Sequence, residues 1–280
     1  MERKLTLTNA QGKTIDLMSD ETLFVEISDL GFSLKNEYKT VGSNFLLTDS
    51  EYTQTGIKGT MYFKGDDPYQ DYFDFINNYT NQDLTLVYNS AKRFNLPCRL
   101  VATSKKENTK DYRSVEVTFV PSSLWYLYLT DYYEPTEIES SGKIYSYEYP
   151  YRYGEGTGEM SVTLTTDTNI PSPVKLTIYG SCTNPQWTQY VGGQKVATGA
   201  MRNTTIGEYE RLVVDATSVN NLIELRNNYN QPIGDLYQKS DFGTERFLYL
   251  RKGQNKFVLT TESSEKVLFV VEARALYESV

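Results

Sequence analysis

Alternating apolar and polar residues recur along the whole chain and predict a protein built mainly of β-strands. A side-chain period of two is the pattern of a strand with one buried face. The clearest examples fall at residues 5–7, 59–63, 84–88, 114–120, 160–164, 174–179, 211–215 and 266–273. The fold class we expect is therefore mainly β.

One segment in the first half of the chain predicts a helix. Asp67 suits the N-cap position and Pro68 the first helical position. Four apolar residues then follow at the spacing of a single helix face: Tyr69, Tyr72, Phe73 and Ile76. We expect this face to pack the helix against the N-terminal sheet.

The length of 280 residues allows two domains or one large all-β unit. A break is expected between Pro121 and about Gly158, because residues 134–142 are rich in turn formers and short of apolar side chains. We therefore predict that residues 143–280 fold alone as a β-sandwich. Proteases should cut between Asp131 and Gly158 and leave two stable fragments.

The same break contains a run of tyrosines. The five tyrosines at odd positions in 145–153 would share one face of an extended strand. Pro150 cannot donate to a strand ladder, so the run predicts an edge strand or a surface connector. The whole chain has 24 tyrosines and 12 phenylalanines, a balance that suits surfaces buried against other chains.

Composition excludes several classes of function. The chain has no histidine, which removes Ser-His-Asp and Cys-His triads and every zinc site that uses imidazole. Its only cysteines are Cys98 and Cys182, for which we expect two buried free thiols rather than a disulfide. The net charge is -8 and no basic cluster exceeds Lys105 and Lys106, so we do not expect nucleic acid as a partner.

Targeting signals are not evident. The N-terminus alternates from the start, and no stretch approaches the run of about twenty apolar residues that a membrane helix needs. We expect no membrane association, and synthesis and folding in a cytoplasm.

Motifs that could carry chemistry are weak. The glycine-rich run at 154–158 lacks the G-x-G-x-x-G spacing and is followed by strand-like sequence, so it predicts an inter-domain turn. A glycosidase without histidine would need a carboxylate pair. The candidate pairs are Asp66 with Asp67, Glu208 with Glu210, and Asp241 with Glu245. Helix capping and exposed strand positions explain these acids equally well, and we predict no catalytic, cofactor-binding or metal site.

One aromatic pair has two interpretations. Trp187 and Tyr190 follow the turn formers Asn184 and Pro185, and they could stack on a sugar ring. Packing in a core or a hairpin is the alternative, and we favour it.

The order of short motifs along the chain resembles a known family. In the first half these are residues 31–34 (GFSL), 59–63 (GTMYF), the helix opening 67–69 (DPY) and 123–126 (SLWY). They look like the N-terminal domain of siphophage distal tail (Dit) proteins. In the second half, residues 181–185 (SCTNP), 212–215 (LVVD), 237–242 (YQKSDF), 247–250 (FLYL) and 252–255 (KGQN) are similar to the C-terminal domain of that family.

The resemblance implies a fold. Residues 1–130 would form a ring-forming tail domain, a β-barrel or sandwich-like domain with one helix. Residues 131–158 would be a linker or edge segment. Residues 159–280 would form a galectin-like or carbohydrate-binding-module-like β-sandwich, a fold that is not in itself a sign of sugar binding.

The resemblance also implies a function. The protein would be a structural virion protein of a siphophage, prophage or tailocin, the baseplate hub that joins the tail tube to the tail tip through a hexameric ring. Its partners would be its own copies, the tail tube protein, and tail-tip, tail-associated lysin or fibre proteins. It would lie at the virion tail tip after assembly in the bacterial host cytoplasm, with no enzymatic activity and no cofactor. The alternative is a carbohydrate-binding module for host cell-wall glycan, with Trp187 and Tyr190 as its stacking platform.

Overall fold

The computed structural model describes residues 4–77, 83–105, 111–134, 160–218, 220–264 and 267–280. The chain forms two compact units, which are described separately below. The first contains residues 1–127 together with 276–280, and the second contains residues 128–275. The tyrosine run at 145–153 and the glycine-rich run at 154–158 lie outside the described residues.

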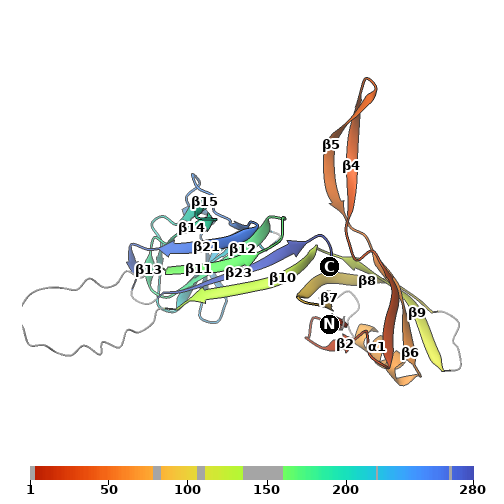
Figure 1. Ribbon diagram of the computed structural model, residues 1–280. Helices are drawn as coiled ribbons and strands as arrows, with labels where there is room; N and C mark the ends of the chain where they lie inside the picture. The colour runs from red at the N-terminus through yellow and green to blue at the C-terminus, as the bar shows by residue number, and fades with distance from the viewer. Residues whose placement is uncertain (1–3, 78–82, 106–110, 135–159, 219, 265–266) are drawn as a thin grey trace, which may run out of the picture. The chain divides into compact units, whose positions relative to one another are not determined.

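The first unit is built on one antiparallel sheet with the strand order β2-β1-β7-β8-β9-β6-β3 (Figure 1). Its strands are β1 (Lys4–Thr8), β2 (Thr14–Asp16), β3 (Thr22–Ser28), β6 (Ile57–Lys64), β7 (Leu84–Asn89), β8 (Arg93–Lys105) and β9 (Tyr112–Pro121). The start of β10 (Trp125–Tyr133) pairs with β8, where Tyr126 lies opposite Asn95. The sheet is open, with β2 and β3 at its two ends, rather than the closed barrel that the resemblance left possible.

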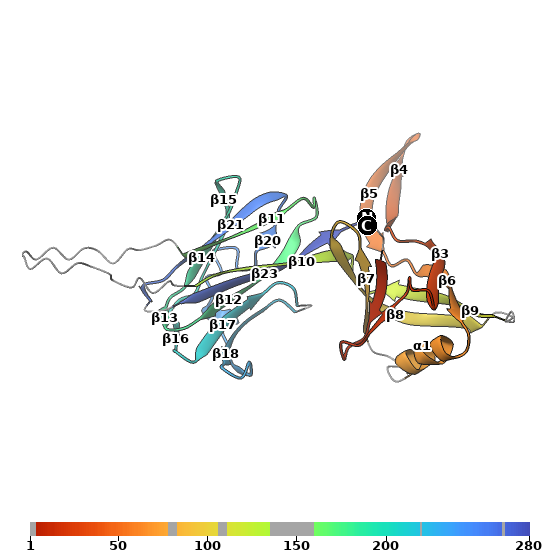
Figure 2. The ribbon, with the colours of Figure 1, turned by 60° about the horizontal axis from the view of Figure 1, so that its bottom comes forward.

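The predicted helix is present as α1 (Asp67–Asn77) and covers part of this sheet (Figure 2). Tyr72 is fully buried, with its ring 5.1 Å from that of Phe63 on β6. Phe75 is also buried, whereas Phe73 is only partly covered. The apolar face is therefore confirmed: Tyr72 is buried, Tyr69, Phe73 and Ile76 are partly buried against the core, and Phe75 is a buried residue that the predicted face did not include.

The helix starts one residue away from the predicted cap. The main-chain carbonyl of Asp66 accepts the hydrogen bond from the Gln70 amide, so Asp66 holds the cap position and Asp67 begins the helix. The Asp66 carboxylate is occupied by Arg113, whose Nε lies 2.6 Å away. That contact lowers the pKa of Asp66 from its ordinary value. Two adjacent aspartates made the position ambiguous in sequence.

The second unit contains two larger sheets (Figure 2). Buried residues alternate with less buried ones along strands of both sheets. One has the order β19-β18-β17-β12-β23-β10, and the other has the order β11-β21-β14-β15. Besides β10, the sheet that ends in β19 contains β12 (Ser172–Tyr179), β17 (Glu210–Asp215), β18 (Leu222–Asn227), β19 (Pro232–Asp235) and β23 (Leu268–Tyr277). The second sheet is β11 (Met160–Thr166), β14 (Gln186–Val191), β15 (Gln194–Ala200) and β21 (Gly253–Thr260). The arrangement is a β-sandwich, and a galectin-like relationship stays a prediction.

Short elements complete the second unit. They are β13 (Cys182–Thr183), β16 (Thr205–Ile206), β20 (Tyr249–Leu250), β22 (Ser263–Ser264) and the 3-10 helix η1 (Tyr237–Lys239). Its core contains the fully buried side chains of Trp187, Phe257 and Phe269. Gln189 and Asn255 are buried among them and bond to each other, Nε2 to Oδ1, at 2.9 Å. This pair satisfies polar atoms that would otherwise be costly to bury.

Both cysteines are buried free thiols, as predicted: Cys98 in the first unit and Cys182 in the second. Burial raises the pKa of Cys98 to about 12 and that of Cys182 to about 11. In the described part of the chain, no helix has the length and hydrophobicity to cross a membrane.

Candidate interaction surface

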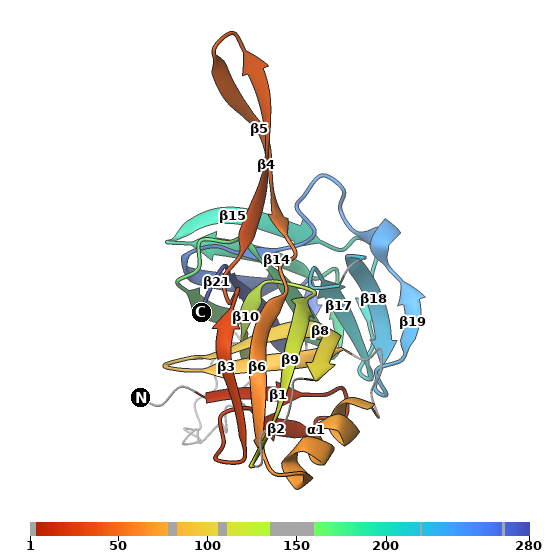
Figure 3. The ribbon, with the colours of Figure 1, turned by 90° about the vertical axis from the view of Figure 1, so that its right-hand side faces the viewer.

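A two-stranded hairpin projects from the sheet of the first unit (Figure 3). Its strands are β4 (Ser33–Val41) and β5 (Asn44–Thr53), joined by the two-residue turn Gly42-Ser43. Gly42 has φ +62°, which suits a tight hairpin turn. Within the described chain both strands pair only with each other, so each leaves one free edge.

The hairpin and the residue before it carry apolar side chains that are exposed in the described chain. Phe45 at the tip is 75% exposed. Beside it, Leu46 is 59% exposed and Leu47 is 50% exposed. The other exposed apolar residues of this segment are Phe32, Leu34, Tyr38, Val41 and Tyr52. Burial of a side chain the size of Phe or Leu stabilises a protein by about 1.5–3 kcal/mol. Covering the tip with another molecule would therefore contribute several kcal/mol of favourable free energy.

One face of the tip gathers much of this surface. Phe45 pairs with Thr40 and Leu47 pairs with Tyr38, and alternation places these side chains on the same face. A bulge follows, where the Thr48 hydroxyl donates to the Glu37 carbonyl at 3.0 Å. A hairpin of two strands is at best marginally stable alone in water. We therefore identify this hairpin as the candidate interaction surface of the first unit.

A pocket of about 280 Å³ lies at the base of the hairpin. Its walls include Phe32, Tyr52 and the buried Trp125. The Tyr52 hydroxyl donates to Glu278 at 2.7 Å, and this bond, with a smaller effect of burial, raises the pKa of Tyr52. The Trp125 indole donates to the Leu30 carbonyl at 2.9 Å. These bonds attach the base of the hairpin to the core while its tip stays uncovered.

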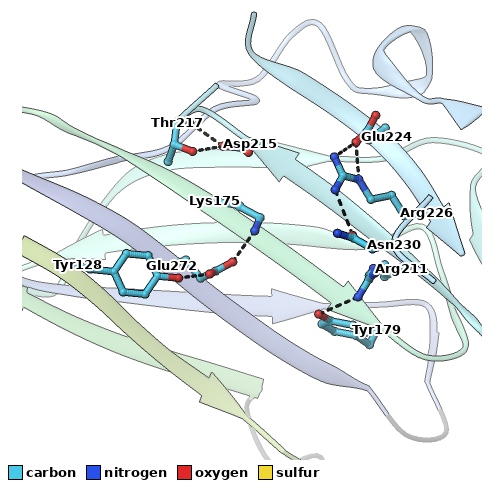
Figure 4. Close-up of polar contacts among 10 residues, drawn as sticks. All are labelled: Tyr128, Lys175, Tyr179, Arg211, Asp215, Thr217, Glu224, Arg226, Asn230 and Glu272. Carbon is cyan, nitrogen blue, oxygen red and sulfur yellow. Dashed lines mark hydrogen bonds and ion pairs between the residues drawn. The ribbon is translucent and has the colours of Figure 1, made fainter. Parts of the chain in front are cut away.

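The larger sheet of the second unit presents a different surface, shown in Figure 4. Lys175 on β12 lies directly across from Glu272 on β23, with Nζ 2.7 Å from Oε2. The Tyr128 hydroxyl donates to the same carboxylate from β10. Burial alone would raise the pKa of Glu272, but the bonds from Lys175 and Tyr128 outweigh it and lower the pKa. These charged side chains satisfy one another.

The same face continues along β12, β17 and β18. Arg211 stacks on the Tyr179 ring at 5.3 Å, and Arg226 contacts both Glu224 and Asn230 (Figure 4). This face is polar and most of its charged groups contact one another, so it differs from the apolar tip of the hairpin.

The two residues of the predicted stacking pair, Trp187 and Tyr190, differ in burial. The Trp187 side chain is fully buried, and its indole lies against Gly199 on β15. An indole without an exposed face cannot stack on a sugar, so the core interpretation describes Trp187 and the stacking interpretation does not. Tyr190 is partly exposed. Sugar binding by the second unit stays a prediction.

The candidate carboxylate pairs each have a structural use. Asp66 contacts Arg113, Glu210 accepts from the Gly207 amide at 2.8 Å, and Asp241 contacts Arg202 at 2.6 Å. Across the described residues, no group of three or more acids or cysteines has the arrangement of a metal site.

Comparison with known proteins shows what most of the first unit is similar to. Residues 4–121 match the model of the distal tail protein N-terminal domain. Most of the first unit is therefore similar to that domain. The resemblance noted from the motifs is thereby confirmed over this part of the chain. No curated protein sequence gives a significant match.

Solved structures show that the likeness in fold extends over the whole chain. A chain from the structure of the phage P2 baseplate in its activated conformation with Ca is 18% identical, with a TM-score of 0.60 and 100% of both chains covered. The SPP1 Dit protein, described as a paradigm of hub adsorption apparatus in phages infecting Gram-positive bacteria, is 12% identical with a TM-score of 0.61. The match covers 97% of this chain and 99% of that one. At these identities the likeness shows a shared fold.

The hairpin was not predicted from the sequence, although the sequence contains a signal for it. Gly42 and Ser43 form a Gly-Ser dipeptide between two runs of strand-forming residues, which is a hairpin turn signature. The flanking runs did not stand out because apolar residues fall on both faces of them, so no period-two pattern marks a buried side. A strand that buries neither face within its own chain lacks the pattern that a core imposes.

Proposed function

We propose that this protein is the hub of a phage tail baseplate and that its N-terminal units form a hexameric ring. The ring would join the tail tube to the tail tip, and the C-terminal units would contact tail-tip or fibre proteins. The protein would act as a structural part of the virion tail, without catalytic activity, after assembly in the host cytoplasm. The distal tail domain at 4–121 and the fold shared with baseplate and hub proteins support this role.

One observation of the molecule itself favours self-assembly. The β4–β5 hairpin exposes Phe45, Leu46 and Leu47 at a tip that no described residue covers. A monomer rarely leaves so large an apolar element uncovered unless it is an interaction site. A contact between the hairpin of one copy and a different surface of the next copy is heterologous, and such contacts generate closed rings when the rotation closes.

The experiment compares the full-length chain with a hairpin variant. We expect the wild-type protein to show six-fold rings in negative-stain electron microscopy and a light-scattering mass near six times 32.1 kDa. Phe45→Asp with Leu47→Asp should abolish the ring without lowering the melting temperature, because both side chains are exposed in the monomer. Charge at these positions opposes burial against another copy.

A matched control tests whether any exposed aromatic would do. Tyr229 is 79% exposed in the second unit, and Tyr229→Asp should leave the ring intact. A protein that stays monomeric at every concentration, or rings that survive the hairpin substitutions, would contradict the proposed role of the hairpin.

A further inference from the structure

A surface hollow in the second unit gathers three cations that have no counter-ion among the described residues. It has a volume of about 660 Å³, and its lining residues come from the β11–β12 connection and from the segment around β20. Figure 2 labels these strands. Its lining includes Arg246, Arg251 and Lys252, with Glu245 as the one acid among the lining residues. None of these three cations forms an ion pair within the described part of the chain.

Three other cations of the unit do have acidic partners. Arg202 and Arg226 contact Asp241 and Glu224, and Lys175 contacts Glu272. In a chain of net charge -8, acidic partners are plentiful. A local excess of positive charge that persists in such a chain is a favourable place for an anion.

The Arg246 guanidinium is held in place by aromatic rings. Its central carbon lies 4.2 Å from the Phe242 ring centre and 4.7 Å from that of Tyr237. Its NH1 atom is buried without a hydrogen-bond partner among the described residues. These two ring contacts hold the guanidinium while leaving its charge without a counter-ion in the described chain, so Arg246 contributes positive charge to the hollow.

The wall that carries Arg251 and Lys252 is held from within by Asn255. The Asn255 side chain accepts from the Arg251 amide at 2.9 Å and donates to the carbonyls of Arg251 and Gly253 at 2.7 and 3.0 Å. Gln189, also buried, donates to the Tyr249 carbonyl at 2.8 Å. Two buried polar side chains thus fix the main chain from residue 249 to residue 253, and they position its outward side chains in advance of any ligand.

The main-chain hydrogen bonds of this wall indicate how a ligand would be recognised. The Leu248, Tyr249 and Arg251 carbonyls and the Arg251 amide already bond within the unit. They are not available to an added strand, which is the usual way an extended peptide binds a sheet. A ligand would therefore be recognised by side chains of the hollow, which include the exposed Tyr249 ring and the exposed Asn169 amide.

We propose that this hollow binds a saccharide that carries a carboxylate or phosphate group. The anion would bind Arg251 and Lys252 within the field of Arg246, because guanidinium groups match both anions with paired hydrogen bonds. The Tyr249 ring would contact the apolar face of the sugar, and Asn169 would bond to its hydroxyls. The site lies wholly in the second unit and is independent of ring assembly through the hairpin.

The test uses the full-length protein and isothermal titration calorimetry with four probes. Tri-galacturonate supplies carboxylates, glucose 6-phosphate supplies a phosphate, maltotriose is the neutral sugar and hexaglutamate is the acidic peptide. We expect at least one anionic sugar to bind and maltotriose not to bind. Binding by tri-galacturonate alone would identify a carboxylated ligand, and binding by glucose 6-phosphate alone a phosphorylated one.

Three variants and one matched control locate the site. Arg251→Gln and Lys252→Gln should each weaken binding about tenfold, the effect of losing one charge-assisted contact. Tyr249→Leu should weaken it without changing the response to salt. Lys195→Gln removes the same charge from an exposed position on β15 and should leave the affinity unchanged.

Several results would overturn the proposal. They are the absence of binding by both anionic sugars, equal binding of maltotriose, or equal effects of Lys252→Gln and Lys195→Gln. Tighter binding of hexaglutamate than of either sugar would instead assign the hollow to an acidic protein segment.

Discussion

Two buried aromatic residues, one in the core of each unit, have a polar atom that makes no hydrogen bond within the described chain. The Tyr72 hydroxyl and the Trp187 indole N–H are both buried and have no hydrogen-bond partner among the described residues. An unpaired buried polar group costs about 1–3 kcal/mol. Both side chains are nonetheless among the largest fully buried ones, so their apolar area outweighs that cost.

Two substitutions of Tyr72 separate the cost of the unpaired hydroxyl from the stabilisation by the buried ring. Tyr72→Phe removes only the unpaired hydroxyl, so we expect an equal or higher melting temperature. Tyr72→Ala removes the ring beside Phe63 and should cost about 3–5 kcal/mol as a large-to-small core change. Phe73→Ala should cost less, because Phe73 is only partly buried. Thermal unfolding followed by circular dichroism checks the order, and a marked loss in Tyr72→Phe would mean that the hydroxyl has a partner.

Gly199 tests the packing of Trp187. A Cβ atom at Gly199 would lie 2.3 Å from the Trp187 Nε1 atom, far inside contact distance. We expect Gly199→Ala to destabilise the protein by about 1–3 kcal/mol, as overpacking does. Gly234→Ala is the matched control, since its nearest neighbour beyond the adjacent residues would be 3.9 Å away. Similar melting temperatures for the two variants would contradict the buried position of the indole.

At the scale of elements, the sequence predicted those that bury one face within their own unit. The strands at 59–63 and 114–120 are confirmed as β6 and β9, and the helix as α1, because each alternates at its own period. The β4–β5 hairpin was missed because neither of its faces is buried in the chain itself. Sequence likewise could not place Trp187, since hydrophobic type alone does not separate a core side chain from a stacking platform.

The contact of β12 with β23 predicts a pH dependence. The pKa of Glu272 is lowered in the folded state, so between that value and its ordinary value of 4.5 the unfolded chain binds more protons. Stability from this contact is therefore full above the ordinary pKa and is lost as the pH falls through the folded value. Glu272→Gln should lower the melting temperature at pH 7, and the difference should shrink toward pH 3.

Two controls belong to this measurement. Glu208→Gln, at an exposed turn, should change the melting temperature little at either pH. Lys175→Met should give a loss at pH 7 similar to that of Glu272→Gln. A difference for Glu272→Gln that is constant with pH would indicate a packing effect rather than a charge effect.

At the scale of the whole molecule, the two units exchange segments of chain. The boundary falls inside β10, between Leu127 and Tyr128, and again inside β23, between Ala275 and Leu276. Residues 128–133 lie in the second unit, beside β23. Residues 276–280 return to the first unit, where the Tyr277 ring packs 5.2 Å from that of Phe94. The linear division at 130 and 159 describes the order of the chain but does not include these exchanges.

The exchange changes what limited proteolysis should show. A cut between residues 134 and 142 leaves an N-terminal fragment that keeps 128–133, a strand of the second unit. The C-terminal fragment keeps Tyr277 and Glu278, which contact Phe94 and Tyr52 in the first unit. Each fragment therefore ends in a segment that belongs to the other unit. We expect two bands in a denaturing gel but one peak in native size-exclusion chromatography.

The truncation that corresponds to this cut gives the contrasting test. A fragment of residues 143–280, expressed alone, lacks 128–133, so Glu272 loses its contact with Tyr128 and one edge of β23 is left unpaired. An unpaired edge invites aggregation. A fragment of residues 128–280 restores that strand and should give a higher melting temperature and remain monodisperse. Equal behaviour of the two fragments, or nicked halves that separate without denaturant, would mean that the exchanged segments do not hold the two halves of the chain together.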